Sequence, residues 1–190
     1  MTEKIKYAII GAGCMGQEHI LNSGIIDDAE VVALCDTSEQ SIQESLELLN
    51  DEVAIFHDYN DLIDANIADA FIIATPNFTH IDVLKDLMKS EVHLLIEKPL
   101  CTTVKDCQEF EKLAENYPGV IWTAMEYRYM PPVQRMINEI HNNTIGDLKM
   151  LSIREHRFPF LHKVDDWNRF AIKTGGTLVE KCCHFFDLMR

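Results

Sequence analysis

The feature that most constrains this 190-residue chain is a glycine-rich loop directly after its first apolar run. Residues 6–10 read Lys-Tyr-Ala-Ile-Ile, a pattern typical of a buried parallel strand. In such a loop the first glycine permits a tight turn, the second lets a pyrophosphate approach the backbone, and the third lets the next helix pack closely. The free N–H groups at the start of that helix favour phosphate. The expected cofactor contacts in the loop are Gly11, Ala12, Gly13, Cys14, Met15 and Gly16.

An acidic residue stands at the distance from this loop that a dinucleotide site requires. Asp36 lies 20 positions beyond Gly16, at the end of the second apolar run, 31–35. Its carboxylate would accept hydrogen bonds from the adenosine ribose hydroxyls and would repel a 2′-phosphate. No Arg or Lys follows it, because the next residues are Thr-Ser-Glu. The sequence therefore predicts NAD, with NADP less favoured, and a fold that binds another ligand such as S-adenosylmethionine is the alternative.

Strand-like runs and helical stretches alternate along the first two thirds of the chain. Beyond the two runs already named, apolar runs fall at 54–57, 70–74, 93–96 and 120–124. Helices are expected at about 15–23, from 37 or 38 to 49, at 78–89 and at 104–116. This alternation indicates a parallel sheet with right-handed crossovers. We expect an α/β fold, with a doubly wound Rossmann sheet as an NAD-binding domain over residues 1–125.

The pattern changes after Tyr127, where a second and incomplete domain is expected over residues 126–190. The elements expected there are a helix at 131–142, a strand with one wetter face at 148–156, a long polar and aromatic loop at 157–174, and a helix at 177–190. Four apolar residues of the last helix would form one buried stripe, namely Leu178, Cys182, Phe185 and Met189. Such a stripe needs a sheet to cover, and little of one is present. We therefore expect the chain to be the N-terminal part of a longer protein.

Charge and composition exclude several classes of partner. The formal net charge is −14, so the protein would repel phosphate backbones and anionic lipid, and neither nucleic acid nor a membrane is an expected partner. No apolar run approaches the ~20 residues of a membrane span, and the first residues do not read as a signal peptide, so a cytoplasmic protein is expected. The six cysteines form no CxxC pair, and no metal site is predicted. The alternative is a metal site at Cys182-Cys183-His184, but adjacent residues on a helix point in different directions and would not converge on one ion.

Three later segments, taken with the glycine loop, resemble a known family. They are Thr75-Pro76-Asn77 with His80, then Glu97-Lys98-Pro99, and then Gly175-Gly176 followed by Glu180 and His184. In this order they resemble the family of glucose–fructose oxidoreductase, inositol dehydrogenase and rhizopine catabolism proteins (Gfo/Idh/MocA). The resemblance covers nearly the whole chain. It implies a second domain with a mostly antiparallel sheet, and a full-length protein that forms a dimer or tetramer of identical subunits.

The resemblance also implies an activity and the residues that perform it. Members transfer a hydride between a secondary alcohol of a sugar, inositol or related polyol and NAD, and Lys98 and His184 would be catalytic. Glu180 stands where the family usually has Asp, and it would contact substrate or orient His184. The expected cofactor contacts outside the glycine loop are Asp36, Thr75, Pro76, Asn77, His80, Glu97 and Lys98. Weaker substrate candidates are Arg128 and Trp167, together with His156, Arg157 and His162.

The chemistry of these residue types suits such a reaction independently of the family. A histidine titrates near neutrality and can accept the hydroxyl proton, and a lysine ammonium stabilises developing alkoxide charge. Glu180 and His184 are four apart on the expected helix and share a face, with Asp187 as a lower-ranked partner. Each of these residues also has an alternative role that is purely structural. Lys98 could be a solvated surface lysine and His184 a histidine packed in a helix. Asn77 could serve to begin a helix, and Glu97 could pair with a neighbouring side chain. The alternative functions are a hydrolase or epimerase that retains NAD, and a non-catalytic NAD-binding regulator.

Overall fold

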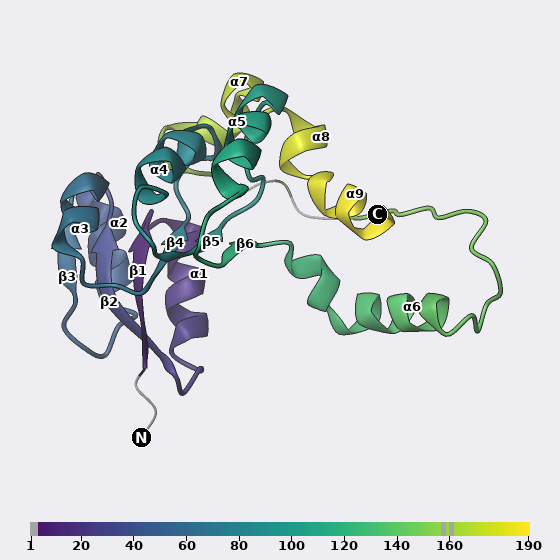
Figure 1. Cartoon of the computed structure of the whole chain (residues 1–190), viewed down its shortest axis with the longest axis horizontal. Helices are drawn as coiled ribbons and strands as arrows, with labels where there is room; N and C mark the ends of the chain where they lie inside the picture. The colour runs from purple at the N-terminus through teal and green to yellow at the C-terminus, as the bar shows by residue number, and fades with distance from the viewer. Residues whose placement is uncertain (1–3, 157–158, 160–161) are drawn as a thin grey trace.

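A computed structural model describes residues 4–156, 159 and 162–190, and its main feature is a parallel sheet. In these residues the sheet has six strands in the order β3-β2-β1-β4-β5-β6 (Figure 1). The strands are β1 (Ile5–Ile10), β2 (Ala29–Cys35), β3 (Ala54–Phe56), β4 (Ala70–Ile73), β5 (His93–Ile96) and β6 (Ile121–Thr123). Every neighbouring pair is parallel. This is the Rossmann order, and the predicted α/β doubly wound class is confirmed.

Helices connect successive strands and cover both faces of the sheet. They are α1 (Cys14–Ser23), α2 (Glu39–Leu46), α3 (Tyr59–Ala65), the short 3₁₀ helix η1 (Asn77–Thr79) with α4 (His80–Leu87), and α5 (Val104–Ala114). The sequence reading placed no helix between β3 and β4, so α3 was missed. Its signal was present, because the Asp58 carboxylate accepts the Asn60 N–H at 2.8 Å as an N-cap and Leu62 is buried one turn later.

Alternate residues of the central strands enter two separate cores, one on each face. In β1, Ala8 and Ile10 join the core that also holds side chains from α3, α4 and α5, while Ile9 joins the core that holds Ile20 of α1. The same alternation places Leu34 of β2 on the α1 side. Because both faces are covered, neither can be polar, which is why these strands read as continuous apolar runs.

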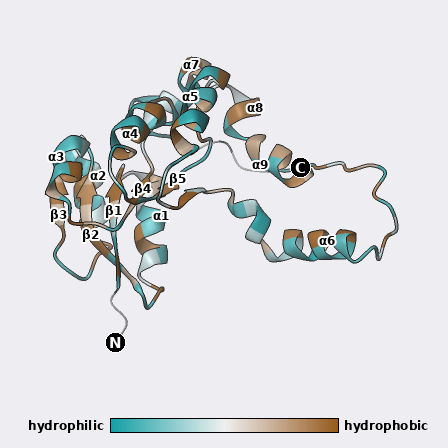
Figure 2. Ribbon diagram, in the orientation of Figure 1, coloured by the Kyte–Doolittle hydropathy of each residue, from teal (hydrophilic) through white to brown (hydrophobic). Residues whose placement is uncertain are grey.

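The chain after β6 is mostly helical and leaves the sheet. Its elements are η2 (Glu126–Tyr129), α6 (Pro131–His141), η3 (Val164–Arg169), α7 (Ala171–Thr174), α8 (Thr177–Glu180) and α9 (Cys183–Met189). In Figure 1, α6 projects away from the sheet, and the residues that follow it form a wide loop that turns back toward α9. Figure 2 shows apolar positions on α6 as well as in the strands, yet α6 buries no residue. This half of the chain is therefore positioned by few packed contacts.

Three sequence expectations for this region are wrong. The loop expected at 157–174 contains the short helices η3 and α7 in its described part. Residues 148–156 form no strand, because no strand in the described part of the chain lies beside them to complete a ladder. The helix expected at 177–190 is broken between α8 and α9, where the Cys182 N–H bonds Thr177 O, five residues back. This wide turn rotates α9 relative to α8, so Leu178 is 68% and Met189 51% exposed. Lys181 and His184 are buried instead of the expected stripe.

Candidate active site

The glycine loop joins β1 to α1, and its three glycines have different surroundings. A Cβ on Gly11, whose φ is +99°, would lie 2.5 Å from the backbone carbon of Ala74. A Cβ on Gly16 would lie 2.0 Å from the carbonyl oxygen of Gly11. A Cβ on Gly13 would meet nothing within 4 Å. Gly11 and Gly16 are thus required by packing, whereas Gly13 borders open space at the start of a helix, where phosphate can approach the backbone.

Asp36 ends β2 beside this loop and is held in a fixed orientation. Its Oδ2 accepts the Ala12 N–H at 2.7 Å and its Oδ1 accepts the Ser38 N–H at 2.8 Å. The carboxylate therefore borders the loop at the carboxyl edge of the sheet, where doubly wound folds bind ligands. Asn77 adds a second sign of a ligand, because its amide is buried and Nδ2 has no hydrogen-bond partner among the described residues. The open face at Gly13 and the unpaired amide fit a dinucleotide.

His80 joins the loops that follow β4 and β5. Its ring is fully buried, with Nε2 3.0 Å from Thr75 O and Nδ1 3.1 Å from Pro99 O. Burial lowers the pKa of His80, although the carbonyls of both loops oppose that shift. The residue expected near the cofactor thus acts as a bridge that holds the Thr75–Asn77 segment against the Glu97–Pro99 segment.

Glu97 pairs with a histidine that sequence reasoning did not single out. His19 Nε2, from α1, lies 2.9 Å from Glu97 Oε1, and the Lys98 N–H donates to Glu97 Oε2 at 3.2 Å. Burial raises the pKa of Glu97, but the hydrogen bond and charge of His19, with the Lys98 amide and ammonium, outweigh it and leave the pKa below its usual value. The helix that follows the glycine loop is thereby tied to the residue beside Lys98. The only sequence signal for His19 was its position as a histidine in the helix that follows the glycine loop.

Lys98, Glu180 and His184 are brought into one region, at the point where α8 and α9 meet the carboxyl end of β5. Lys98 Nζ donates to the backbone oxygen of Glu180 at 3.4 Å. His184 is 1% exposed, and its Nε2 lies 3.4 Å from Glu126 Oε1. Burial first, and then the Lys98 and Lys181 charges, lower the pKa of His184 to about 4. His184 is therefore neutral at pH 7 and able to accept a proton.

The carboxylate nearest to His184 differs from those expected. Asp187 forms a two-pronged ion pair with the Arg128 guanidinium, so both residues are engaged with each other. Glu126, which the sequence reading did not name, faces the imidazole instead, and burial raises its pKa. The sequence signal for Glu126 was its place three residues after β6, at the ligand-binding edge of the sheet.

The remaining substrate candidates lie in the loop region. Trp167 is partly exposed in η3, and His162 pairs with Asp166 at 2.7 Å on the surface. His156 is exposed, and Arg157 lies outside the described residues. The hydrogen bonds of the described residues do not link Trp167, His156 or His162 to Lys98 or His184.

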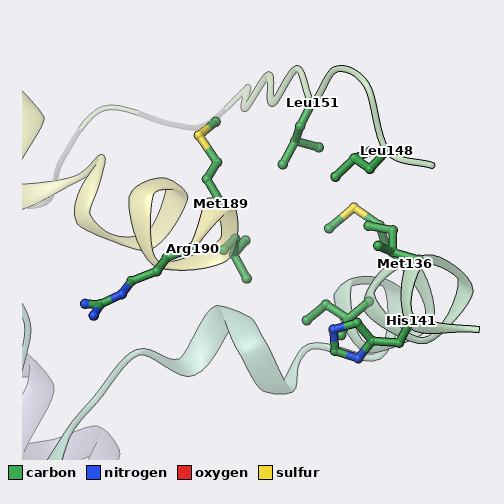
Figure 3. Close-up of a pocket in the computed structure, with 9 residues that line it drawn as sticks. Met136, His141, Leu148, Leu151, Met189 and Arg190 are labelled. Atoms are coloured by element: carbon green, nitrogen blue, oxygen red, sulfur yellow. The ribbon is translucent and has the colours of Figure 1, made fainter.

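A hollow lies elsewhere, between α6, residues 148–151 and α9. Figure 3 shows Met136, Leu148, Leu151 and Met189 pointing into it. Its volume is about 190 Å³, below the ~300–1,000 Å³ of most ligand pockets. It contains none of the glycine-loop residues and neither Lys98 nor His184, so it is separate from the candidate active site.

The described residues hold neither a metal centre nor a membrane span. Across 4–156, 159 and 162–190, no three His, Cys, Asp or Glu side chains gather as metal ligands would. No helix in that part of the chain has both the length and the apolar character needed to cross a membrane.

Comparisons with known proteins cover both halves of the chain. A family model described as "Oxidoreductase family, NAD-binding Rossmann fold" matches residues 5–125, and one described as "Oxidoreductase family, C-terminal alpha/beta domain" matches residues 137–190. The rhizopine catabolism protein MocA of Rhizobium meliloti is 26% identical over 98% of this chain and 56% of its own length. An inositol 2-dehydrogenase of Arthrobacter sp. (strain FB24) is 32% identical over 84% of this chain and 47% of its own length.

Solved structures share the fold. The myo-inositol 2-dehydrogenase of Lactobacillus plantarum superposes with a TM-score of 0.80 at 22% identity, covering 99% of this chain and 56% of that one. The scyllo-inositol dehydrogenase of Lactobacillus casei, solved with NAD(H) and scyllo-inositol, gives a TM-score of 0.71 at 20% identity, covering 76% of this chain and 43% of that one. The chain spans about half the length of the curated relatives it matches.

Proposed function

Because this chain belongs to the Gfo/Idh/MocA family of NAD-binding oxidoreductases, we propose that the protein containing it oxidises a secondary alcohol. The substrate class is a sugar, an inositol or a related polyol, and NAD takes the hydride. The observation that carries the proposal is the meeting of Lys98, Glu180 and a neutral, buried His184 at the edge of the sheet where Gly13 and Asp36 also lie.

Each residue has a defined role in this proposal. His184 accepts the proton of the substrate hydroxyl, a role for which the ring must be neutral, as it is at pH 7 with a pKa of about 4. The Lys98 ammonium stabilises the alkoxide charge that develops as that proton leaves. Glu180, whose side chain is one methylene longer than aspartate, is assigned to contact a substrate hydroxyl or to orient His184.

The cofactor side of the site has its own set of residues. Gly13 and the first turn of α1 bind the pyrophosphate, and Asp36 binds the adenosine ribose. NAD is preferred to NADP, because a 2′-phosphate would approach the Asp36 carboxylate with no Arg or Lys beside it. The other proposed contacts are Ala12, Cys14, Met15, Gly16, Thr75, Pro76, Asn77, Glu97 and Lys98, with His80 acting through the loops it joins.

Relatives support the substrate class. Those matched include inositol 2-dehydrogenases and the glucose-6-phosphate 3-dehydrogenase of Bacillus subtilis. We also propose a division into an NAD-binding domain at 1–125 and the start of a substrate domain at 126–190. A full-length homo-oligomer in the cytoplasm remains a prediction.

The test is a panel of inositols, sugars and sugar acids with NAD or NADP, assayed on the full-length protein. We expect NAD reduction with at least one polyol, and a loss of turnover of about 100-fold or more in Lys98→Ala, as when a charge-stabilising donor is removed elsewhere. Lys173→Ala is the matched control, because that lysine lies over the Phe78 and Phe170 rings instead.

Other outcomes would contradict the proposal in different ways. Tightly held NAD with no net NADH release would indicate the hydrolase or epimerase alternative. NAD binding with no turnover on any substrate would indicate a regulator, and unchanged turnover in Lys98→Ala would remove Lys98 from the reaction.

A further inference from the structure

His184 is packed against an aromatic ring. Its imidazole lies parallel to the Tyr127 ring, with centroids 4.1 Å apart and an interplanar angle of 5°. Nδ1 has no hydrogen-bond partner among the described residues. Histidines that exchange protons are usually oriented by a hydrogen bond at the nitrogen that does not react. In this site the parallel ring is the contact that defines the plane of the imidazole.

Tyr127 is itself held from its other side. Its hydroxyl donates to Glu155 Oε1 at 2.9 Å, and Lys181 Nζ donates to the same hydroxyl and pairs with Glu155 Oε1 at 3.0 Å. The Lys181 ammonium also lies 4.6 Å from the centre of the Tyr127 ring, within the range of a cation–π contact. Its side chain is 8% exposed. Burying an ammonium this far costs free energy unless it is paired, and the hydroxyl, carboxylate and ring together pair it.

Lys181 also contributes charge to the surroundings of His184. The cations that face the imidazole are Lys98 and Lys181, and the carboxylates are Glu97, Glu126 and Asp187. After burial, the two ammonium groups are the main cause that lowers the pKa of His184. Lys98 is assigned to the substrate in the proposed function. Among the described residues, the side chain of Lys181 contacts Tyr127, Glu155 and the Phe185 ring.

We propose that Tyr127 and Lys181 are positioning residues for His184. The Tyr127 ring fixes the plane of the imidazole, and Lys181 with Glu155 fixes the Tyr127 ring, so that the proton acceptor keeps one orientation and stays neutral. This inference rests on the proposed function, because it assigns His184 the role of proton acceptor. Neither Tyr127 nor Lys181 takes part in the transfer itself.

The test follows the ionisation of His184 alone, by deuterium exchange at its ring C2 position. Mass spectrometry of the peptide that contains it, across pH 5–8, gives the midpoint in the full chain. The parent protein is expected to show no His184 midpoint in that range. Tyr127→Leu removes the covering ring and Lys181→Met removes the charge, so each is expected to raise the midpoint by about 1 pH unit or more, into that range.

Conservative and distant variants separate positioning from general damage. Tyr127→Phe keeps the ring, so its His184 midpoint is expected to lie closer to that of the parent than the midpoint of Tyr127→Leu does. Tyr59→Phe loses a comparable hydroxyl–carboxylate bond, to Asp86 at 3.0 Å, and Lys173→Met loses a comparable cation over aromatic rings. Both controls are expected to leave the His184 midpoint where the parent has it. If Tyr127→Leu does not fold, the His184 midpoints of Tyr127→Phe and Lys181→Met are compared with the parent value, and a raised midpoint in Lys181→Met supports the inference.

A second measurement separates this inference from the proposed function. In the active enzyme, the acid limb of the kcat/KM profile is expected to move to higher pH in Lys181→Met, with the KM for NAD unchanged. If no dehydrogenase activity is found, the exchange midpoints still decide whether Tyr127 and Lys181 act on His184. Midpoints in Tyr127→Leu and Lys181→Met that equal those of the two controls would overturn the inference.

Discussion

Single residues decide the chemistry at the edge of this sheet, and His184 shows how far surroundings alter an ordinary side chain. A histidine in water titrates near pH 6.5, but burial and two ammonium groups lower the pKa of His184 to about 4. The sequence left open whether this imidazole is a packed histidine or a base. The structure shows that it is buried and neutral, and a neutral ring is what the proposed role as a base requires. Its neutrality at pH 7 is a consequence of packing, and it has a measurable effect on stability.

Acid is expected to destabilise the protein through His184, beginning at a pH above the usual carboxyl range. Between pH 6.5 and 4 the unfolded chain binds a proton at this residue and the folded chain does not, so stability falls as pH falls through that window. The difference in pKa corresponds to at most about 3 kcal/mol. Urea unfolding at pH 7 and at pH 4.5 measures it.

The control for this prediction is His184→Gln, which cannot titrate and should lose less stability on acidification. His80 contributes in the same direction in both proteins, because its pKa is also lowered. Glu97 acts at lower pH, since its lowered pKa makes its stabilisation start to decline near the usual carboxyl pKa and disappear as pH falls through its own lower pKa. If the stability of the parent and of His184→Gln depended equally on pH, the acid destabilisation could not be assigned to His184.

At the scale of elements, the turn from β1 into α1 is the part of the site that local stereochemistry alone explains. The three glycines have separate reasons to be glycine: a positive φ and a close backbone approach at Gly11, helix packing at Gly16, and access for a ligand at Gly13. The first two of these reasons concern folding, whereas the open position at Gly13 is the one that we propose for cofactor binding. Two alanine substitutions therefore separate the stability of the loop from its function.

Gly16→Ala is expected to lose about 1–3 kcal/mol of stability, because its Cβ would lie 2.0 Å from the Gly11 oxygen and the backbone must shift. Gly13→Ala is expected to change stability by less than about 1 kcal/mol, since its φ of −77° suits alanine and nothing lies near the new methyl group. That methyl group would occupy the space of the phosphate and weaken NAD binding by about tenfold or more. Urea unfolding measures the change in stability, and titration of tryptophan fluorescence with NAD measures the change in affinity. An unchanged NAD affinity in Gly13→Ala would contradict the assignment of the pyrophosphate to this loop.

For the whole molecule, the two halves differ in how much surface they bury. The Rossmann half has a core on each face of its sheet, while α6 buries no residue and the ends of the α8–α9 segment remain exposed. Leu178, Phe186 and Met189 are large apolar side chains on that surface. Exposed apolar surface of this kind favours association in water.

The 190-residue chain in isolation is accordingly expected to self-associate. Light scattering after size exclusion should show a mass that grows with protein concentration. Replacing Leu178 and Phe186 together by serine should reduce that growth. Ile25→Ser, at an exposed position after α1, should not. A monodisperse chain that unfolds cooperatively would contradict the prediction.

The sequence by itself determined the features that depend on neighbours along the chain. Apolar runs located the six strands, and the spacing of Gly11, Gly16 and Asp36 identified the cofactor, because strand periodicity and backbone stereochemistry act over a few residues. The same local reasoning failed at 148–156, since a strand exists only where another strand pairs with it, and at the last helix, where a wide turn changed the face.

Only the tertiary structure decided which side chains meet. His19 reaches Glu97 across 78 positions, Glu126 lies 3.4 Å from His184, and Lys181 is buried against Tyr127 and Glu155. None of these pairs has a sequence spacing that predicts it, because the approach of two elements is set by the packing of everything between them. The glycine loop could thus be read from the chain, whereas the surroundings that set the protonation of His184 could not.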